Sequence, residues 1–249
     1  MAKLRIQSVK KYIEDNISTF HEARENGLQE LKLSKILLKK NPYLFKAKNI
    51  LTSQELVKNL VDAYLSSQEE TMFGTFLEGL AIFVCRKVYN GHKSAAEGID
   101  LEFEKDAVKY IVTVKSGINW GNSSQVAKML DNFRKAKKIL GTNTGKTNIV
   151  AINGCCYGRI QKIDKGEYLK IAGQQFWEFI SDNKNLYTDI IEPLGHKAKE
   201  RNQNFDKEYS RLLNIFTLEF SKIFCVDGNI NWNKLVQFNS GKEKIKVNI

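Results

Sequence analysis

Residues 97–103 read EGIDLEF and residues 108–115 read VKYIVTVK, and these two arms of a predicted β-hairpin decide the fold. Apolar and polar side chains alternate along both arms, which is typical of half-buried strands because successive side chains point to opposite faces. The alternation puts the apolar side chains of the first arm, from Ile99 onward, on one face. It puts Asp100 on the other face, which in the second arm carries Lys115.

The turn between the arms decides whether the carboxylate and the ammonium meet. A two-residue turn at 105–106 sets Asp100 opposite Ile111, out of reach of Lys115. A four-residue turn over 105–108 sets Asp100 opposite Thr113 and diagonal to Lys115. Diagonal neighbours lie about 7–8 Å apart at the backbone, so only the second register brings the two groups together. A solvated hairpin with scattered charges is the alternative interpretation.

Composition indicates a globular, basic protein. The chain has 249 residues, of which 42% are hydrophobic, and a formal net charge of +11. An excess of Lys and Arg implies attraction to a polyanion, most commonly nucleic acid, although a lysine-rich solvated surface gives the same count. No apolar run approaches the ~18 residues of a membrane span and residues 1–5 do not begin a signal peptide, so we expect a cytoplasmic protein without a membrane partner.

The chain predicts a single α/β domain over 1–249. We expect a helical arm over 1–50, a core over 66–195 and a helical C-terminal extension over 196–249. The arm carries 11 Lys/Arg against 5 Asp/Glu, and it could dimerise, face DNA or simply cap the core. Cysteines show no zinc-ligand spacing and are expected to be reduced and buried as small apolar groups.

Two capping-box patterns, at 52–55 and 67–70, predict the starts of two further helices. The second predicted helix carries a buried apolar stripe, and Glu78 lies on its flank among small residues. A carboxylate beside a buried face calls for a partner or a metal ion unless it reaches solvent.

The polar loop 116–125, SGINWGNSSQ, contains good helix N-caps, and a basic helix is expected over 124–140. A buried strand is predicted over 147–153, followed by shorter strands at 156–160 and 168–171. Helices alternating with strands in this order predict an α/β arrangement with a mixed sheet.

Hydrolysis of a phosphodiester needs a divalent cation to neutralise developing charge and a group that positions the attacking water. Mg²⁺ prefers a few oxygen ligands plus waters, so Asp100, a second carboxylate and the carbonyl of Val114 could hold it. Lys115 could then orient the water and stabilise the developing charge.

Gly98-Ile99-Asp100, the hairpin and the segment 112–115, VTVK, resemble the core of PD-(D/E)XK nucleases. The loop 116–125 resembles that of bacterial type II restriction endonucleases, closest to enzymes that cut short interrupted palindromes rich in G and C. This resemblance implies a restriction-endonuclease-like α/β/α core with a central mixed sheet. It also implies Mg²⁺-dependent, sequence-specific cleavage of double-stranded DNA that leaves 5′-phosphates.

The same resemblance implies partners. A homodimer is expected because a two-fold protein matches a palindromic site. A cognate methyltransferase would act on the same DNA site without needing to bind the nuclease.

Carried over by position, the family's first Asp falls on Asp100 and its Lys on Lys115. Thr113 stands where the family has a second catalytic acid, and Ile99 stands where the motif name has Pro. Since relatives can draw the second acid from a neighbouring helix, Glu78 is the first candidate for that catalytic and metal-binding role.

Glu97 and Glu102 are the substitute candidates for the second acid. Glu102 has an alternative role as the cross-strand partner of a lysine in the hairpin. The implied metal ligands are therefore Asp100, Glu78 and the carbonyl of Val114.

Polar residues of the loop and of the helix after it are candidates for DNA contact, since exposed N–H groups and short amides can bind a phosphate or a base edge. They could also serve only to cap the helix. Trp120 could anchor the loop on the core or touch DNA. The candidates are Asn119, Asn122, Ser123, Ser124, Gln125 and Lys128.

Two rival functions fit the sequence. A nuclease of the same fold could recognise DNA structure, as repair and junction-resolving enzymes do. Alternatively, the neutral residue at Thr113 could mark a catalytically inactive DNA-binding protein.

Overall fold

The computed structural model describes residues 3–143 and 148–242. The chain divides into two compact units, each built from two stretches of sequence. Met1–Ser18 and Met72–His196 form what we call the sheet unit, and Thr19–Thr71 and Lys197–Ile249 form the helical unit. Helices α1 (Ile6–Gln29) and α4 (Ser53–Tyr89) each contribute residues to both units.

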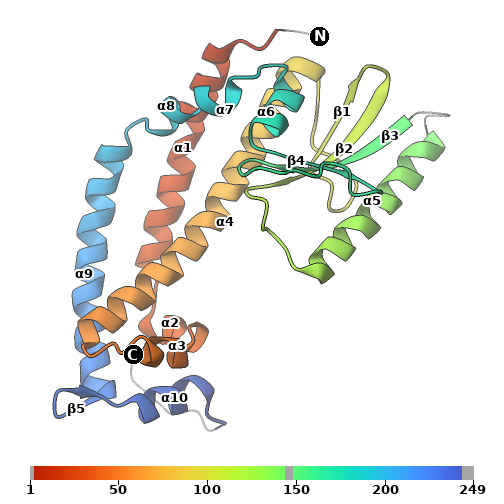
Figure 1. Cartoon of the computed structure of the whole chain (residues 1–249). Coiled ribbons are helices and arrows are strands. Elements are labelled where there is room, and N and C mark those ends of the chain that lie inside the picture. Colours follow the sequence, from red (N-terminus) through yellow and green to blue (C-terminus); the bar gives the residue numbers. More distant parts are fainter. Residues whose placement is uncertain (1–2, 144–147, 243–249) are drawn as a thin grey trace. The chain divides into compact units, whose positions relative to one another are not determined.

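The sheet unit contains a mixed four-stranded sheet, as the sequence predicts (Figure 1). The strand order is β1-β2-β3-β4. β1 (Leu101–Lys105) is antiparallel to β2 (Val108–Lys115), whereas β3 (Asn148–Cys155) runs parallel to β2, and β4 (Leu169–Ala172) parallel to β3. Thr147, where the sequence places the start of β3, lies outside the described residues.

Helices cover both faces of this sheet, which gives the expected α/β/α core. On one face α5 (Ser123–Asn143) packs Met129 and Phe133 against Ile111 of β2. On the other face the aromatic rings of Phe103 and Tyr110 meet Phe179 of α6 (Gln174–Ser181), and Tyr89 of α4 stacks on Phe103. Both faces of the hairpin are therefore buried, rather than only one.

The hairpin has the register that brings Asp100 toward Lys115. Lys105 pairs with Val108 and Leu101 with Val112, so Asp100, one residue before β1, lies opposite Thr113. The central turn residues, 106–107, both have positive φ, which is the type I′ geometry that matches the twist of a hairpin.

Two local predictions in this unit are wrong. Ile99 does not share a face with Leu101, because it precedes the strand and packs in the α5 cluster with Ile111. Residues 156–160 form no strand, and Gly158 there has a φ of 102°, which ends extended structure. After α6 the unit continues with two short helices, α7 (Leu186–Asp189) and α8 (Ile191–Leu194).

The helical unit has its own apolar core. α2 (Leu33–Lys39), α3 (Pro42–Ala47), α9 (Ala198–Phe224) and α10 (Trp232–Ser240) surround it, with a small antiparallel pair, β5 (Cys225–Val226) and β6 (Asn229–Ile230). Apolar residues of the N-terminal arm lie in this core, at Leu31, Leu33, Ile36 and Leu37.

One of the two predicted helix starts is confirmed. The Thr52 hydroxyl accepts a hydrogen bond from the Glu55 amide, and α4 begins at Ser53. The second predicted start, at Ser67, is wrong because α4 runs through it without a break. No helix in the described part of the chain is both long and apolar enough to cross a membrane.

Candidate active site

Asp100 and Lys115 meet in the structure. Asp100 Oδ2 lies 3.6 Å from Lys115 Nζ and accepts a 2.7 Å hydrogen bond from the backbone amide of Val114. Both side chains are partly buried, with 19% and 31% of their surfaces exposed. The Asp100 amide donates to the Val112 carbonyl at 2.9 Å, so the β-ladder extends to this residue and fixes its place beside β2.

Glu78 approaches this pair from α4. A Cβ built on Gly74, one helical turn before Glu78, would lie 3.7 Å from Ser116 Cβ, so this face of the helix lies against the residue that follows Lys115. Burial raises the pKa of Glu78, and the negative charge of Asp100 raises it further. Lys93, whose Nζ lies 3.5 Å from Glu78 Oε1, and Lys115 partly offset these two effects. Glu78, Asp100 and Lys115 thus share one electrostatic environment.

The substitute acids are engaged elsewhere. Glu97 is 79% exposed at its side chain and pairs loosely with Lys128 at 3.8 Å. Glu102 is buried, lies 3.1 Å from Lys109 Nζ and accepts a hydrogen bond from the Ser94 hydroxyl. The alternative role of Glu102 as partner of a hairpin lysine is therefore confirmed.

Thr113 points into the interior, where it is 1% exposed. Its hydroxyl accepts a 3.0 Å hydrogen bond from the Asn153 side-chain amide and lies 3.5 Å from the sulfur of Met129. Asn153 Oδ1 in turn accepts a 3.1 Å hydrogen bond from Trp120 Nε1. Trp120 therefore anchors its loop on the core, which was one of its two predicted roles.

Sequence reasoning missed Asn153 as a residue of this site. The signal was present, because Asn153 is an amide inside a run of apolar strand residues, and a buried amide needs hydrogen-bond partners.

The loop after β2 caps α5 as expected. Asn122 Oδ1 accepts a hydrogen bond from the Gln125 amide, and Gln125 Oε1 accepts one from the Asn122 amide, a reciprocal capping box. The six residues expected to contact DNA are all exposed: Asn119, Asn122, Ser123, Ser124, Gln125 and Lys128.

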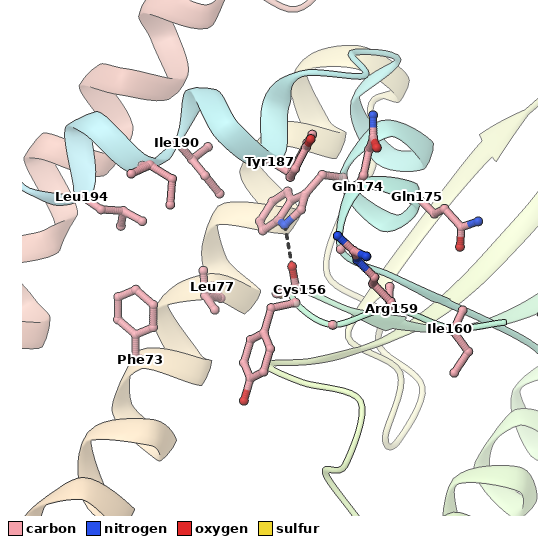
Figure 2. A pocket seen from close by; sticks show the side chains of 16 residues that line it. Phe73, Leu77, Cys156, Arg159, Ile160, Gln174, Gln175, Tyr187, Ile190 and Leu194 are labelled. Atoms are coloured by element: carbon pink, nitrogen blue, oxygen red, sulfur yellow. Dashed lines mark hydrogen bonds between the residues drawn. The ribbon is translucent and has the colours of Figure 1, made fainter.

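A separate pocket of about 700 Å³ lies elsewhere in the sheet unit (Figure 2). Its wall combines Phe73 and Leu77 of α4 with the segment after β3 and with α6 to α8, and its polar side chains include Arg159 and Gln174. Asp100, Lys115 and Glu78 do not line it. Its lining contains no carboxylate that could hold a divalent ion for phosphodiester hydrolysis.

The carboxylates of the site suit a divalent ion with few protein ligands. The described residues contain no group of three or more His, Cys, Asp or Glu side chains that could hold a metal. Glu78 and Asp100 nevertheless lie close enough for the charge of one to raise the pKa of the other. Two carboxylates that repel each other, together with the carbonyl of Val114, match the small oxygen set that Mg²⁺ takes along with several waters.

Comparison with known proteins shows which family the chain belongs to. No curated protein sequence matches the chain. A family model described as type II restriction endonuclease EcoO109I matches residues 7–202, which include both arms of the hairpin, Glu78 and Asn153. The chain therefore belongs to this family of type II restriction endonucleases.

Proposed function

We propose that the protein is a Mg²⁺-dependent, site-specific endonuclease that hydrolyses phosphodiester bonds of double-stranded DNA and leaves 5′-phosphate ends. Membership of the family implies a nuclease, a hydrolase that acts on double-stranded DNA. The observation that carries the finer proposal is the convergence of Glu78 from α4 on Asp100 and Lys115 of the hairpin.

Asp100, Glu78 and the carbonyl of Val114 are the residues that would hold the ion. When bound, Mg²⁺ supplies positive charge next to the phosphate that is attacked. Asp100 is oriented for this role by the Val114 amide, which fixes the direction of its carboxylate.

Lys115 has a different role. Its ammonium, 3.6 Å from Asp100, orients the attacking water and stabilises charge that develops on the phosphate. The hydroxyl of Thr113 takes no part as a metal ligand in this scheme, because it is turned into the interior.

The exposed polar residues at the start of α5 complete the proposal as phosphate contacts. The capping amides of Asn122 and Gln125 hold the helix N-terminus in place, and Lys128 lies in the next turn. Lys128 is only loosely paired with Glu97, so a DNA phosphate could replace that partner at little cost. Two-fold DNA sites match a homodimer, which we include in the proposal.

The test is cleavage of a supercoiled plasmid of mixed sequence in Mg²⁺ by the wild type, Lys115→Ala and Glu78→Ala. Lys58→Ala and Glu208→Ala are matched controls, because both are exposed ion-pair residues of the helical unit. We expect discrete, reproducible fragments from the wild type and controls, at least a 100-fold loss in both site variants, and no cleavage after EDTA treatment.

Other outcomes point to other functions. Full activity of Lys115→Ala would overturn the proposed site, and full activity of Glu78→Ala would move the second acid elsewhere. A smear, or cleavage restricted to branched DNA, would favour a structure-specific nuclease of the same fold. Intact DNA together with tight binding would favour an inactive DNA-binding protein.

A further inference from the structure

We infer that Asn153 is a positioning residue that fixes the catalytic lysine, Lys115, through the indole of Trp120. The inference rests on the proposed function for the role of Lys115. It assigns a task to a buried hydrogen-bond chain, Thr113–Asn153–Trp120, that the proposed chemistry does not otherwise use.

Two hydrogen bonds determine the orientation of the Asn153 side chain, and the Cys155 thiol makes a weaker third contact with its Oδ1 at 4.0 Å. Its Nδ2 donates to Thr113 Oγ1 at 3.0 Å, and its Oδ1 accepts from Trp120 Nε1 at 3.1 Å. The indole nitrogen is only a donor, so a flipped amide would place two donors against each other. Asn153 is 1% exposed, and it pairs directly with Thr113 between the parallel strands β3 and β2.

The Trp120 ring, held by Asn153, in turn contacts the Lys115 ammonium. Lys115 Nζ lies 5.5 Å from the centroid of the Trp120 ring, within the range of a cation–π interaction, and Trp is the best side chain for that contact. Asp100 Oδ2 holds the same ammonium at 3.6 Å. A lysine has a flexible four-carbon stem, so two contacts define its position much better than one.

Packing alone does not account for the amide at position 153. An apolar residue such as Leu would fill the same space in β3 without the cost of burying an amide. It would, however, leave the indole N–H without its partner and release the ring that covers Lys115. Because catalysis depends strongly on the placement of reacting groups, loss of this restraint should lower the rate of the chemical step more than the affinity for DNA.

The kinetic test compares Asn153→Leu, Trp120→Phe and the double variant. Trp120→Phe keeps an aromatic ring beside Lys115 but removes the donor to Asn153. We expect kcat to fall about 10-fold in each single variant, with KM for DNA within about 2-fold of the wild-type value. The double variant should be no slower than the worse single variant, because both changes break the same chain of contacts. Trp177→Phe is the matched control. It removes a buried hydrogen bond of 2.9 Å from the Trp177 indole to the Cys156 carbonyl, but the Trp177 side chain does not contact Lys115. The kcat of this variant should equal that of the wild type.

A second measurement does not depend on cleavage. In a ¹H–¹⁵N NMR spectrum the indole signal of Trp120, identified by its absence in Trp120→Phe, should shift and exchange faster with solvent in Asn153→Leu. It should also shift in Lys115→Met, because the cation over the ring is lost. Trp120→Phe carries the kinetic test if Asn153→Leu does not fold.

The outcomes separate the inference from the proposed function. A wild-type protein that leaves DNA intact overturns the proposed function, while the NMR shifts still decide whether the three side chains are coupled. A wild type that cleaves, with unchanged kcat in both single variants or with strictly multiplicative losses in the double variant, overturns the positioning role of Asn153. An unmoved Trp120 signal in Lys115→Met also overturns it.

Discussion

Restoring a carboxylate at position 113 should damage this protein rather than improve it. Thr113 occupies the place of the family's second acid, yet its side chain is 1% exposed and bonded to Asn153. The variant Thr113→Glu therefore puts a longer, ionisable side chain into the packed layer between β2 and α5, beside Met129.

Three contributions determine how much unfolding free energy Thr113→Glu loses. Overpacking a filled interior costs about 1–3 kcal/mol. Loss of the hydrogen bond from Asn153 costs about 1 kcal/mol. The carboxyl group, buried and opposite Asp100, avoids a larger penalty only by taking up a proton, which itself costs stability at neutral pH. We expect a loss of about 3–5 kcal/mol at pH 7, or a melting temperature lower by about 10 °C for a chain of this size.

Circular dichroism melts at pH 5 and pH 8, alongside plasmid cleavage in Mg²⁺, test this expectation. Since the folded-state pKa of the new carboxyl lies above its unfolded value, its penalty is smallest at low pH and grows as pH rises. Thr113→Val, which removes only the hydroxyl, is the control and should lose about 1 kcal/mol. A Thr113→Glu protein that melts within about 2 °C of the wild type and cleaves faster would refute the argument, because position 113 would then open onto the metal site.

Three further predictions concern the rest of the sheet unit. Although burial opposes its charge, hydrogen bonds from Ser94 and Lys109 lower the pKa of Glu102. The variant Glu102→Gln should therefore lose about 1–3 kcal/mol of unfolding free energy at pH 7, measured by chemical denaturation. The difference from the wild type should close as pH falls below about 4.5. Ala107→Gly should raise the melting temperature by about 1–3 °C, because Ala107 has a φ of 59° that glycine adopts without strain. Burial raises the pKa of the Cys155 thiol to about 11, so a thiol reagent at pH 8 should leave it unmodified in the folded protein and label it in urea.

The contact between Asp100 and Lys115 could be predicted from the sequence because it depends on local rules. A period of two assigns faces in a hairpin, and of the two turn lengths that the sequence allows, the four-residue turn sets Asp100 opposite Thr113, which is the register the structure has. The position of Glu78 on a closely packed helix face could be predicted for a similar reason. Small residues at helical spacing indicate a face that can approach another element closely, and Gly74 on this face lies against Ser116.

Features that depend on long-range context could not be predicted in this way. Ser67 carries a capping pattern, but α4 runs through this polar stretch because its buried residues on either side, Tyr64 and Leu65 before it and Phe76 and Leu77 after it, hold the helix in place. The segment 156–160 has strand-like composition, but β3 ends at Cys155, and the positive φ of Gly158 turns the backbone out of the extended conformation. The sequence shows that Asn153 is a polar residue in an apolar strand. Its hydrogen-bond partners could not be predicted, because Trp120 and Thr113 lie 33 and 40 positions away in the sequence.

In the proposed site, the neutral residue at position 113 is compensated by an acid from a helix. With Thr113 turned inward, the hairpin supplies only Asp100, whose carboxylate is already shared between the Val114 amide and Lys115. Glu78 comes from α4 and adds a second carboxylate without disturbing the β-ladder. Since burial and Asp100 both raise the pKa of Glu78, the proposed divalent cation would relieve the repulsion between the two carboxylates if it bound both.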